Sequence, residues 1–201
     1  MTGTNGEMVC IIPAKGNSSR CPRKNKRDFF GTPMLAYSIE TARKSGLFVD
    51  TIVSTDDGET AKIATTYGAK AMARQPGWDE LGTQELAGEI LKGMENAPQF
   101  AAVIYATAPL LDVSDLLFAS TLWNRKSFML SVGTEPLRDA AAFYFGLTKD
   151  FVNRAPLLSA FTQMYPLMES RVCDINTPDD LARAEKMYAK LHGIDMRLTA
   201  K

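Results

Sequence analysis

The sequence predicts a single-domain α/β fold of three layers, in which a mostly parallel β-sheet lies between two layers of helices. Short apolar runs typical of buried strands alternate with amphipathic segments typical of helices along the chain. The 201 residues, of which 45% are hydrophobic, suffice for one sizeable core. No linker, repeat or low-complexity tract divides the sequence. Residues 8–201 are therefore expected to form one domain behind a flexible N-terminus, residues 1–7.

The first elements have clear boundaries in the sequence. Residues 9–12 are an apolar run typical of a strand that is buried on both faces. The next helix is expected to have Thr32 as its N-cap and Pro33 in its first position, and to end at Gly46. A second strand over residues 51–55 and a helix that stops at Gly68 follow.

The same alternation continues to the end of the chain. The expected elements are a strand at 70–73, a helix at 82–96, a strand at 101–106, a helix from Asp112 or Ser114 to about 124, strands at 128–132 and 141–145, and a helix from Pro178 to about His192 that Thr177 caps. In a sheet built this way, ligands bind at the carboxyl ends of the strands, near the reversal of strand order. The segments 13–25 and 54–57, with Thr107 and Asp174, all follow predicted strands and are expected on that rim.

Composition argues against several functional classes. Equal numbers of basic and acidic residues, 23 of each, give no overall attraction to nucleic acid or to an anionic membrane. Cys10, Cys21 and Cys173 are odd in number and scattered, which argues against a disulfide framework and for a reducing compartment. No stretch approaches the roughly 20 apolar residues of a membrane span. We therefore expect a cytoplasmic protein without nucleic-acid or membrane partners.

The loop after the first strand has the chemistry that a nucleoside triphosphate needs. It begins with small residues that let the backbone approach a phosphate closely, Gly16, Asn17, Ser18 and Ser19. It also holds four cations that would neutralise a polyphosphate, Lys15, Arg20, Arg23 and Lys24. The spacing matches neither the P-loop nor the dinucleotide fingerprint. On charge pattern alone, a solvated basic turn is an equally good interpretation.

Residues 12–25 resemble a specific family signature, I-P-A-R-G-G-S-K-R-I-P-R-K-N, found in the cytidylyltransferases that activate nine-carbon sugar acids as CMP-sugars. Further segments are similar to motifs of that family in the same order, namely 30–39 (F-G-K-P-M-L-A-Y-S-I), 53–57 (V-S-T-D-D), 105–109 (Y-P-T-A-P), 139–144 (D-A-G-Q-F-Y) and 174–180 (D-I-D-T-x-E-D). The third and fourth are closest to the branch that acts on pseudaminic acid. The resemblance runs from Met8 to about Tyr188 and implies a Rossmann-like sheet of the nucleotide-diphospho-sugar transferase type.

The resemblance implies a nucleotidyltransferase reaction. The anomeric hydroxyl of a nonulosonic acid, sialic or pseudaminic acid-like, would attack the α-phosphate of CTP, and pyrophosphate would leave. The implied partners are CTP and a small sugar acid, and the implied cofactor is Mg²⁺. Two alternatives stay open at this point. One is a related nucleotidyltransferase with another sugar acid or base, and the other is a non-catalytic nucleotide-binding homologue.

The resemblance also carries the family's functional residues onto this sequence. The catalytic group would be Lys15, Arg20, Lys24 and Asp174. The nucleotide would contact Pro13, Ala14, Lys15, Gly16, Asn17, Ser18, Ser19, Arg20, Lys24, Asn25, Arg74 and Thr83, with Arg74 on the base. The sugar acid would contact Tyr105, Thr107 and Tyr144, and the metal would lie on Asp174 and Asn176. From the residues themselves, Asp174 could instead cap the last helix, and Tyr144 could pack inside a strand.

Four departures from the family pattern bear on these expectations. Lys15 stands in place of arginine, Ser19 in place of a lysine, and Asn176 in place of the second aspartate of D-I-D. In addition, only residues 133–138 occupy a region where the family carries a long excursion that binds the sugar acid and exchanges contacts across a dimer. We expect a weakened site, and the identity of the sugar acid and a homodimer are left open. His192, the one histidine, is expected to be a partner of the helix dipole at the end of the last helix.

Overall fold

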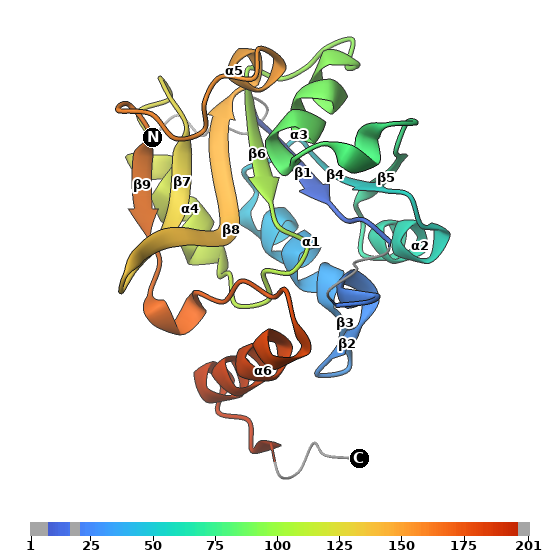
Figure 1. The fold of residues 1–201 in the computed structure, drawn as a ribbon, viewed down its shortest axis with the longest axis vertical. Helices are drawn as coiled ribbons and strands as arrows, with labels where there is room; N and C mark the ends of the chain where they lie inside the picture. Colours follow the sequence, from blue (N-terminus) through green and yellow to red (C-terminus); the bar gives the residue numbers. More distant parts are fainter. Residues whose placement is uncertain (1–7, 17–20, 197–201) are drawn as a thin grey trace.

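The computed structural model describes residues 8–16 and 21–196, which contain a seven-stranded sheet with helices on both faces (Figure 1). Its strands are β1 (Met8–Pro13), β4 (Asp50–Thr55), β5 (Lys70–Ala73), β6 (Phe100–Ile104), β7 (Met129–Thr134), β8 (Leu137–Leu147) and β9 (Gln163–Pro166). A separate two-stranded ribbon consists of β2 (Asp28–Phe29) and β3 (Thr32–Pro33). The prediction for residues 1–7 lies outside the described residues.

The helices alternate with these strands along the chain. The α-helices are α1 (Met34–Ser45), α2 (Gly58–Thr66), α3 (Thr83–Lys92), α4 (Val113–Leu122), α5 (Thr148–Val152) and α6 (Pro178–His192). Three short 3₁₀ helices are η1 (Lys24–Lys26), η2 (Trp78–Glu80) and η3 (Glu169–Arg171). None of the helices within the described ranges is both long and apolar enough to span a membrane.

The sheet order is β5-β4-β1-β6-β8-β7-β9. All neighbouring strands pair in parallel except β8, which runs antiparallel to both β6 and β7. The predicted mostly parallel sheet is therefore confirmed. From β1 the chain moves through β4 to β5 at one side, and it then returns to place β6 on the other side of β1. The reversal of strand order thus lies between β1 and β6, where ligands of such sheets bind.

Two layers of helices bury the two faces of the sheet (Figure 1). One face packs against α1, α2 and α4 through side chains such as Leu35, Ala64 and Leu116. The other face packs against α3 and α5. Gly88 lets these two helices come close, because a Cβ at this position would lie 2.5 Å from the carbonyl oxygen of Phe151. The expected three-layer arrangement follows from these two apolar interfaces.

The last helix has a different position. α6 packs against the β2–β3 ribbon and the start of α1, at one end of the sheet in Figure 1. The ring of Tyr188 lies 5.2 Å from that of Phe29 and 5.4 Å from that of Tyr37, both edge to face. This aromatic cluster holds α6, and the segment before it, at the rim where β1 and β6 end.

Several helix boundaries agree with the sequence, whereas the start of α1 and the end of α3, which is at Lys92 and not at 96, do not. Gly46 has a positive φ of 65° at the end of α1, and the side chains of Asp112 and Thr177 cap α4 and α6. The prediction that Thr32 caps α1 is wrong. The backbone of Thr32 pairs with Phe29 in the ribbon, so the helix starts only at Met34 and has no side-chain cap.

Candidate active site

A cavity of about 680 Å³ opens at the carboxyl ends of β1 and β6. It brings together ten of the predicted site residues, Pro13, Lys15, Lys24, Asn25, Arg74, Thr83, Tyr105, Thr107, Asp174 and Asn176. Three residues in its wall were not predicted, Asp79, Leu81 and Ala106. Segments that are far apart in the sequence thus converge at the point where strand order reverses.

Two lysines of the predicted phosphate loop lie on different walls of this cavity. The ammonium group of Lys15 donates to the backbone oxygen of Asp79 at 3.2 Å. The ammonium group of Lys24 donates to the backbone oxygen of Ile175 at 2.8 Å. The side-chain amide of Asn25 donates to the backbone oxygen of Lys15 at 2.7 Å and closes the loop. A bound polyphosphate would therefore meet a cation from each side.

The start of the loop is fixed by close contact with the end of β4. The amide of Gly16 donates to a carboxylate oxygen of Asp56 at 2.6 Å. A Cβ on Gly16 would lie only 2.3 Å from the Cβ of Asp57, so no larger residue fits this backbone path. Ala14 is fully buried, and its amide donates to the backbone oxygen of Ser54. These two predicted nucleotide contacts therefore position the loop and do not line the cavity.

The rest of the predicted loop is not part of this geometry. Asn17, Ser18, Ser19 and Arg20 lie outside the described residues. Asp57, in the V-S-T-D-D segment, caps α2 through Thr60 and forms an ion pair with Lys26 of η1 at 3.0 Å. Asp56 and Asp57 thus tie the two ends of the loop to β4 and α2.

At another wall of the cavity, Arg74 is almost enclosed. Its side chain is only 6% exposed, and Nη1 lies 3.2 Å from a carboxylate oxygen of Asp79. Its backbone amide donates to Thr55, which extends β5 by one bond. Among the residues that the structure describes, no group pairs with the buried Nε. The guanidinium group of Arg74 also lines the cavity, where its other N–H groups can donate to an acceptor on a ligand.

The opposite wall carries the predicted metal ligands. The side-chain amide of Asn176 donates to a carboxylate oxygen of Asp174 at 2.6 Å. The cap of α6 is formed by Thr177 and Asp180. The carboxylate of Asp180 also accepts from the backbone amide of Asn176. Asp174 therefore does not cap the helix, and its exposed carboxylate faces the cavity.

The oxygen atoms at this wall fit Mg²⁺. The ion prefers oxygen ligands and usually takes one or two carboxylates, while phosphate and water complete its shell. Asp174 offers such a carboxylate, and Asn176 offers an amide oxygen beside it. No group of three or more acidic, histidine or cysteine side chains placed to hold a metal ion occurs in residues 8–16 and 21–196.

Two of the three predicted sugar contacts line the cavity, and the third is buried behind its wall. Tyr105 and Thr107 line the cavity. Tyr144 is fully buried, and its hydroxyl donates to the hydroxyl of Thr83 at 3.1 Å. Tyr144 therefore packs inside the sheet and meets the cavity only through Thr83. Burial raises the pKa of the Tyr105 and Tyr144 hydroxyls, so both stay protonated near neutral pH.

Asp139 is a site neighbour that the sequence interpretation did not select. Partial burial raises the pKa of its carboxyl, and the charge of Asp174 raises it further. Its carboxylate accepts from the amide of Ala141 at 2.7 Å, and Ala141 has a positive φ of 50° beside a register shift between β7 and β8. Such irregularities re-aim side chains at the ends of sheets. The signal in the sequence was its place at the start of the D-A-A-A-F-Y segment.

The expected shortening between β7 and β8 takes the form of a tight hairpin. Only Glu135 and Pro136 separate the two strands. Glu169 of η3 accepts from the amides of Thr134 and Glu135, and it pairs with Arg138 at 2.7 Å. These contacts, that with Arg138 first, lower the pKa of Glu169 to about 2. The hairpin is thus attached to the segment that leads to Asp174.

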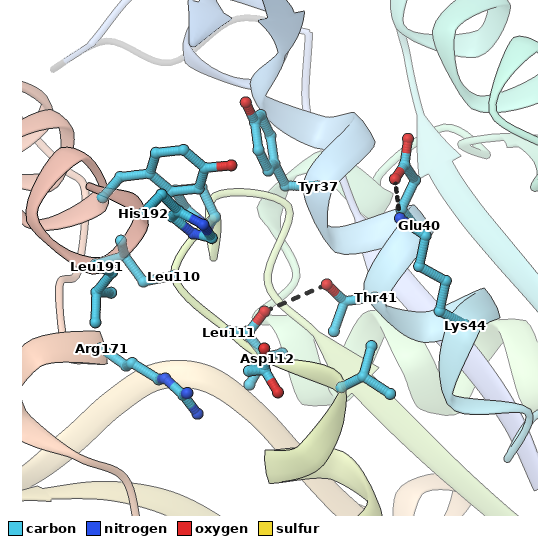
Figure 2. A pocket seen from close by; sticks show the side chains of 13 residues that line it. Tyr37, Glu40, Thr41, Lys44, Leu110, Leu111, Asp112, Arg171, Leu191 and His192 are labelled. Atoms are coloured by element: carbon cyan, nitrogen blue, oxygen red, sulfur yellow. Dashed lines mark hydrogen bonds and ion pairs between the residues drawn. The ribbon is translucent and has the colours of Figure 1, made fainter. Parts of the chain in front are cut away.

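A second cavity, of about 470 Å³, lies between α1, the segment before α4 and α6 (Figure 2). Its polar side chains have partners within the protein. Thr41 donates to Leu111, Lys44 pairs with Glu40, and Arg171 pairs with Asp115. The ring of His192, the last residue of α6, lies 4.1 Å from that of Tyr188 in a tilted arrangement. Because its charges are already paired, this cavity suits a polyphosphate less well than the first.

Comparison with known proteins identifies the family of this chain. Residues 9–143 match the family profile described as Cytidylyltransferase. The chain is 33% identical to the pseudaminic acid cytidylyltransferase of Campylobacter jejuni subsp. jejuni serotype O:23/36 (strain 81-176), with 92% of this chain and 97% of that protein covered. The chain belongs to the cytidylyltransferase family. This cytidylyltransferase is thus an enzyme of the nucleotidyltransferase class.

A further sequence match and a structural superposition support the same family and fold. The N-acylneuraminate cytidylyltransferase of Escherichia coli O18:K1:H7 (strain RS218 / NMEC) is 31% identical over 59% of this chain and 28% of its own length. The structure of CMP:2-keto-3-deoxy-manno-octonic acid synthetase in complex with CTP superposes with a TM-score of 0.75. That superposition has 14% identity and covers 92% of this chain and all of the other, so it supports the fold.

The alignment with the Campylobacter jejuni relative also shows a difference in length. It runs over 225 positions, more than the 201 residues of this cytidylyltransferase. The relative therefore carries insertions that this chain lacks.

Proposed function

We propose that this cytidylyltransferase joins CMP from CTP to the anomeric hydroxyl of a nonulosonic acid of the pseudaminic acid type and releases pyrophosphate. One observation carries the proposal. The cavity at the strand reversal unites Lys15, Lys24, Arg74 and Asp174, in a chain of which 92% aligns with a pseudaminic acid cytidylyltransferase. These residues supply cations for phosphates, a donor for a base and a carboxylate for a metal.

The protein's contribution to this reaction is position and charge. Lys15 and Lys24 face the cavity from two walls and would hold the triphosphate between them. Their charges would offset the negative charge that grows on the departing pyrophosphate. Arg74 would fix the base, and so set the distance from the α-phosphate to the sugar. Because no covalent intermediate is needed, orientation accounts for most of the expected acceleration.

Mg²⁺ is the proposed cofactor, and Asp174 and Asn176 would hold it. When bound, the ion supplies positive charge to the phosphate oxygens. Asp174 contributes a fixed carboxylate, which the amide of Asn176 orients through their 2.6 Å hydrogen bond. Asn176 brings no negative charge of its own, so the ion would be held more weakly than by two carboxylates.

The sugar acid would occupy the part of the cavity next to Tyr105 and Thr107. Both side chains carry hydroxyls that can donate to a carboxylate or accept from a sugar hydroxyl. Tyr144 supports this wall from behind through Thr83. The charge of Asp139, after burial, also raises the pKa of Tyr105 and Tyr144.

Two further parts of the proposal concern the cell and the assembly. We expect the enzyme in the cytoplasm, where CTP is available. A homodimer also stays a prediction, which the exposed apolar side chains of Phe118, Leu122 and Met164 on α4 and β9 support. Sedimentation of the purified protein over a range of concentrations tests it, and a constant monomer mass would contradict it.

Pyrophosphate release tests the proposed reaction. The enzyme is incubated with Mg²⁺, one of CTP, UTP, GTP or ATP, and one of pseudaminic acid, N-acetylneuraminic acid or an eight-carbon keto-deoxy sugar acid. We expect release that requires CTP together with a nine-carbon acid. A different base or the eight-carbon acid would indicate a related nucleotidyltransferase. Binding of CTP without turnover on any acid would indicate a non-catalytic homologue.

A further inference from the structure

Arg74 and Asp79 form a fixed pair in the wall of the cavity. Nη1 of Arg74 lies 3.2 Å from a carboxylate oxygen of Asp79, so a donor and an acceptor stand side by side. The side chain of Arg74 is 6% exposed and that of Asp79 is 46% exposed, so the carboxylate is the more accessible of the two. Both residues line the cavity that holds the phosphate-loop lysines.

Several contacts hold this pair in place. Trp78 packs against the core beneath η2, and the backbone amide of Arg74 continues the bonding of β4 through Thr55. The backbone oxygen of Asp79 also accepts from Lys15 at 3.2 Å. The carboxylate of Asp79 is thus presented by a short anchored loop, and the lysine contact depends on its backbone alone.

A protein donor beside a protein acceptor complements the N3 and C4 groups of cytosine, but it does not complement those of uracil. Cytosine has an acceptor at N3 next to an amino donor at C4, whereas uracil has a donor at N3 next to an acceptor oxygen at C4. Carboxylates are the usual acceptors for the cytosine amino group. Arg74 can donate to N3 or to the neighbouring O2, and Asp79 can accept from the amino group. With uracil, the O4 atom would face the carboxylate, and two acceptors would repel each other.

We propose that Asp79 is the residue that selects cytosine over uracil, by accepting from the 4-amino group of the base while Arg74 donates to the ring. The inference rests on the proposed function, since it assumes that the base of CTP lies against Arg74. It adds a specificity determinant that the motif comparison did not include. An arginine that donates to O2 can do so in either base, so that contact does not discriminate between cytosine and uracil.

The test is the ratio of CTP to UTP affinity, measured by calorimetry with the full-length protein and Mg²⁺. The Asp79→Asn variant keeps the size of the side chain and the backbone contact with Lys15, and its amide can rotate to donate to O4. We expect the preference for CTP to fall at least about tenfold, in part through a gain in UTP affinity. Glu80→Gln is the matched control, because Glu80 belongs to the same η2 turn and is not among the residues that line the cavity.

The outcomes separate this inference from the proposed function. If the unmodified protein binds no nucleotide, or prefers GTP or ATP, the proposed function fails. If it prefers CTP and Asp79→Asn keeps the same preference, only the role of Asp79 fails. A loss of affinity for CTP and UTP by the same factor would show that Asp79 merely positions Arg74, and would also overturn the inference. A fall in the CTP preference without a change in melting temperature supports it.

Discussion

The carboxylate of Asp174 is exposed at the cavity and makes its one described side-chain hydrogen bond with Asn176. Its removal should therefore affect the reaction and not the fold. We expect Asp174→Ala to lower pyrophosphate release by about a hundredfold or more, by analogy with the loss of other charge-stabilising groups, with an unchanged melting temperature. Asp179→Ala, in the exposed first turn of α6, is the control. Near-normal turnover of Asp174→Ala would contradict its place at the metal.

Asn176 allows the opposite experiment at the same wall. In Asn176→Asp a second carboxylate replaces the amide that now donates to Asp174. Without metal the two charges repel, so stability should fall at neutral pH, whereas Mg²⁺ should bind more tightly because both carboxylates can contact it. We expect higher turnover at limiting Mg²⁺ and a larger rise of melting temperature on adding the ion. Equal responses of variant and wild type would place the metal elsewhere.

The residues of the site differed in how well they could be predicted. Lys15, Lys24 and Asp174 belong to segments whose order and spacing match a family, so their types were informative before any geometry was known. Arg74 lies outside those segments and was expected only because the resemblance implies an arginine on the base. The role of Asp79 was not predictable in this way. It depends on η2, where the chain turns back so that Asp79 contacts Arg74, five residues earlier. No local pattern in the sequence indicates that contact.

At the scale of single elements, α2 shows a stabilising cap that also anchors the phosphate loop. Hydrogen bonds from the hydroxyl and amide of Thr60, with a contribution from Lys26, lower the pKa of Asp57 from its ordinary value of 3.8 to about 2. The folded state thus favours the ionised form. Its stabilisation is present in full above about pH 4 and is lost as the pH falls through about 2.

Two variants of this cap give a testable pH dependence. Asp57→Ala should cost about 1 kcal/mol at pH 7, the usual value for an N-cap, or roughly 2–4 °C in melting temperature for a chain of this size. The difference from wild type should shrink as the pH falls from about 4 to 2. Asp57→Asn keeps the cap without the charge, so its loss should be smaller. A constant difference across this range would show that the charge of Asp57 does not contribute.

The elements that could be predicted are those with a strong local signal. Buried strands such as β1 and β6 are continuous apolar runs, and the caps of α4 and α6 are visible as Asp112 and Thr177. β9 was not predicted from the sequence because it is a four-residue edge strand with one buried side chain. The antiparallel direction of β8 follows from its hairpin with β7, and the start of α1 was displaced by the ribbon. Both depend on pairing between segments, which hydrophobic periodicity does not report.

At the scale of the whole molecule, the cavity draws its walls from both halves of the sheet. The ends of β1, β5 and β6 meet the segment before α6, which the aromatic cluster around Tyr188 holds in position. A ligand that contacts all of these walls binds only the folded chain, so its binding energy adds to the free energy of unfolding. Nucleotide binding should therefore be visible in global stability as well as in activity.

This linkage gives a prediction for the intact protein. At a hundredfold excess over its dissociation constant, CTP with Mg²⁺ should add about 2.7 kcal/mol to stability, which is roughly 5–10 °C in melting temperature. Chelation of Mg²⁺ should remove part of this rise in melting temperature, because the negative phosphates and the carboxylate of Asp174 then repel each other. The rise caused by Mg²⁺ should be smaller in Asp174→Ala than in the wild type, while the rise caused by CTP alone remains. A metal effect of wild-type size in this variant would mean that Asp174 does not hold the ion, although the nucleotide binds as proposed.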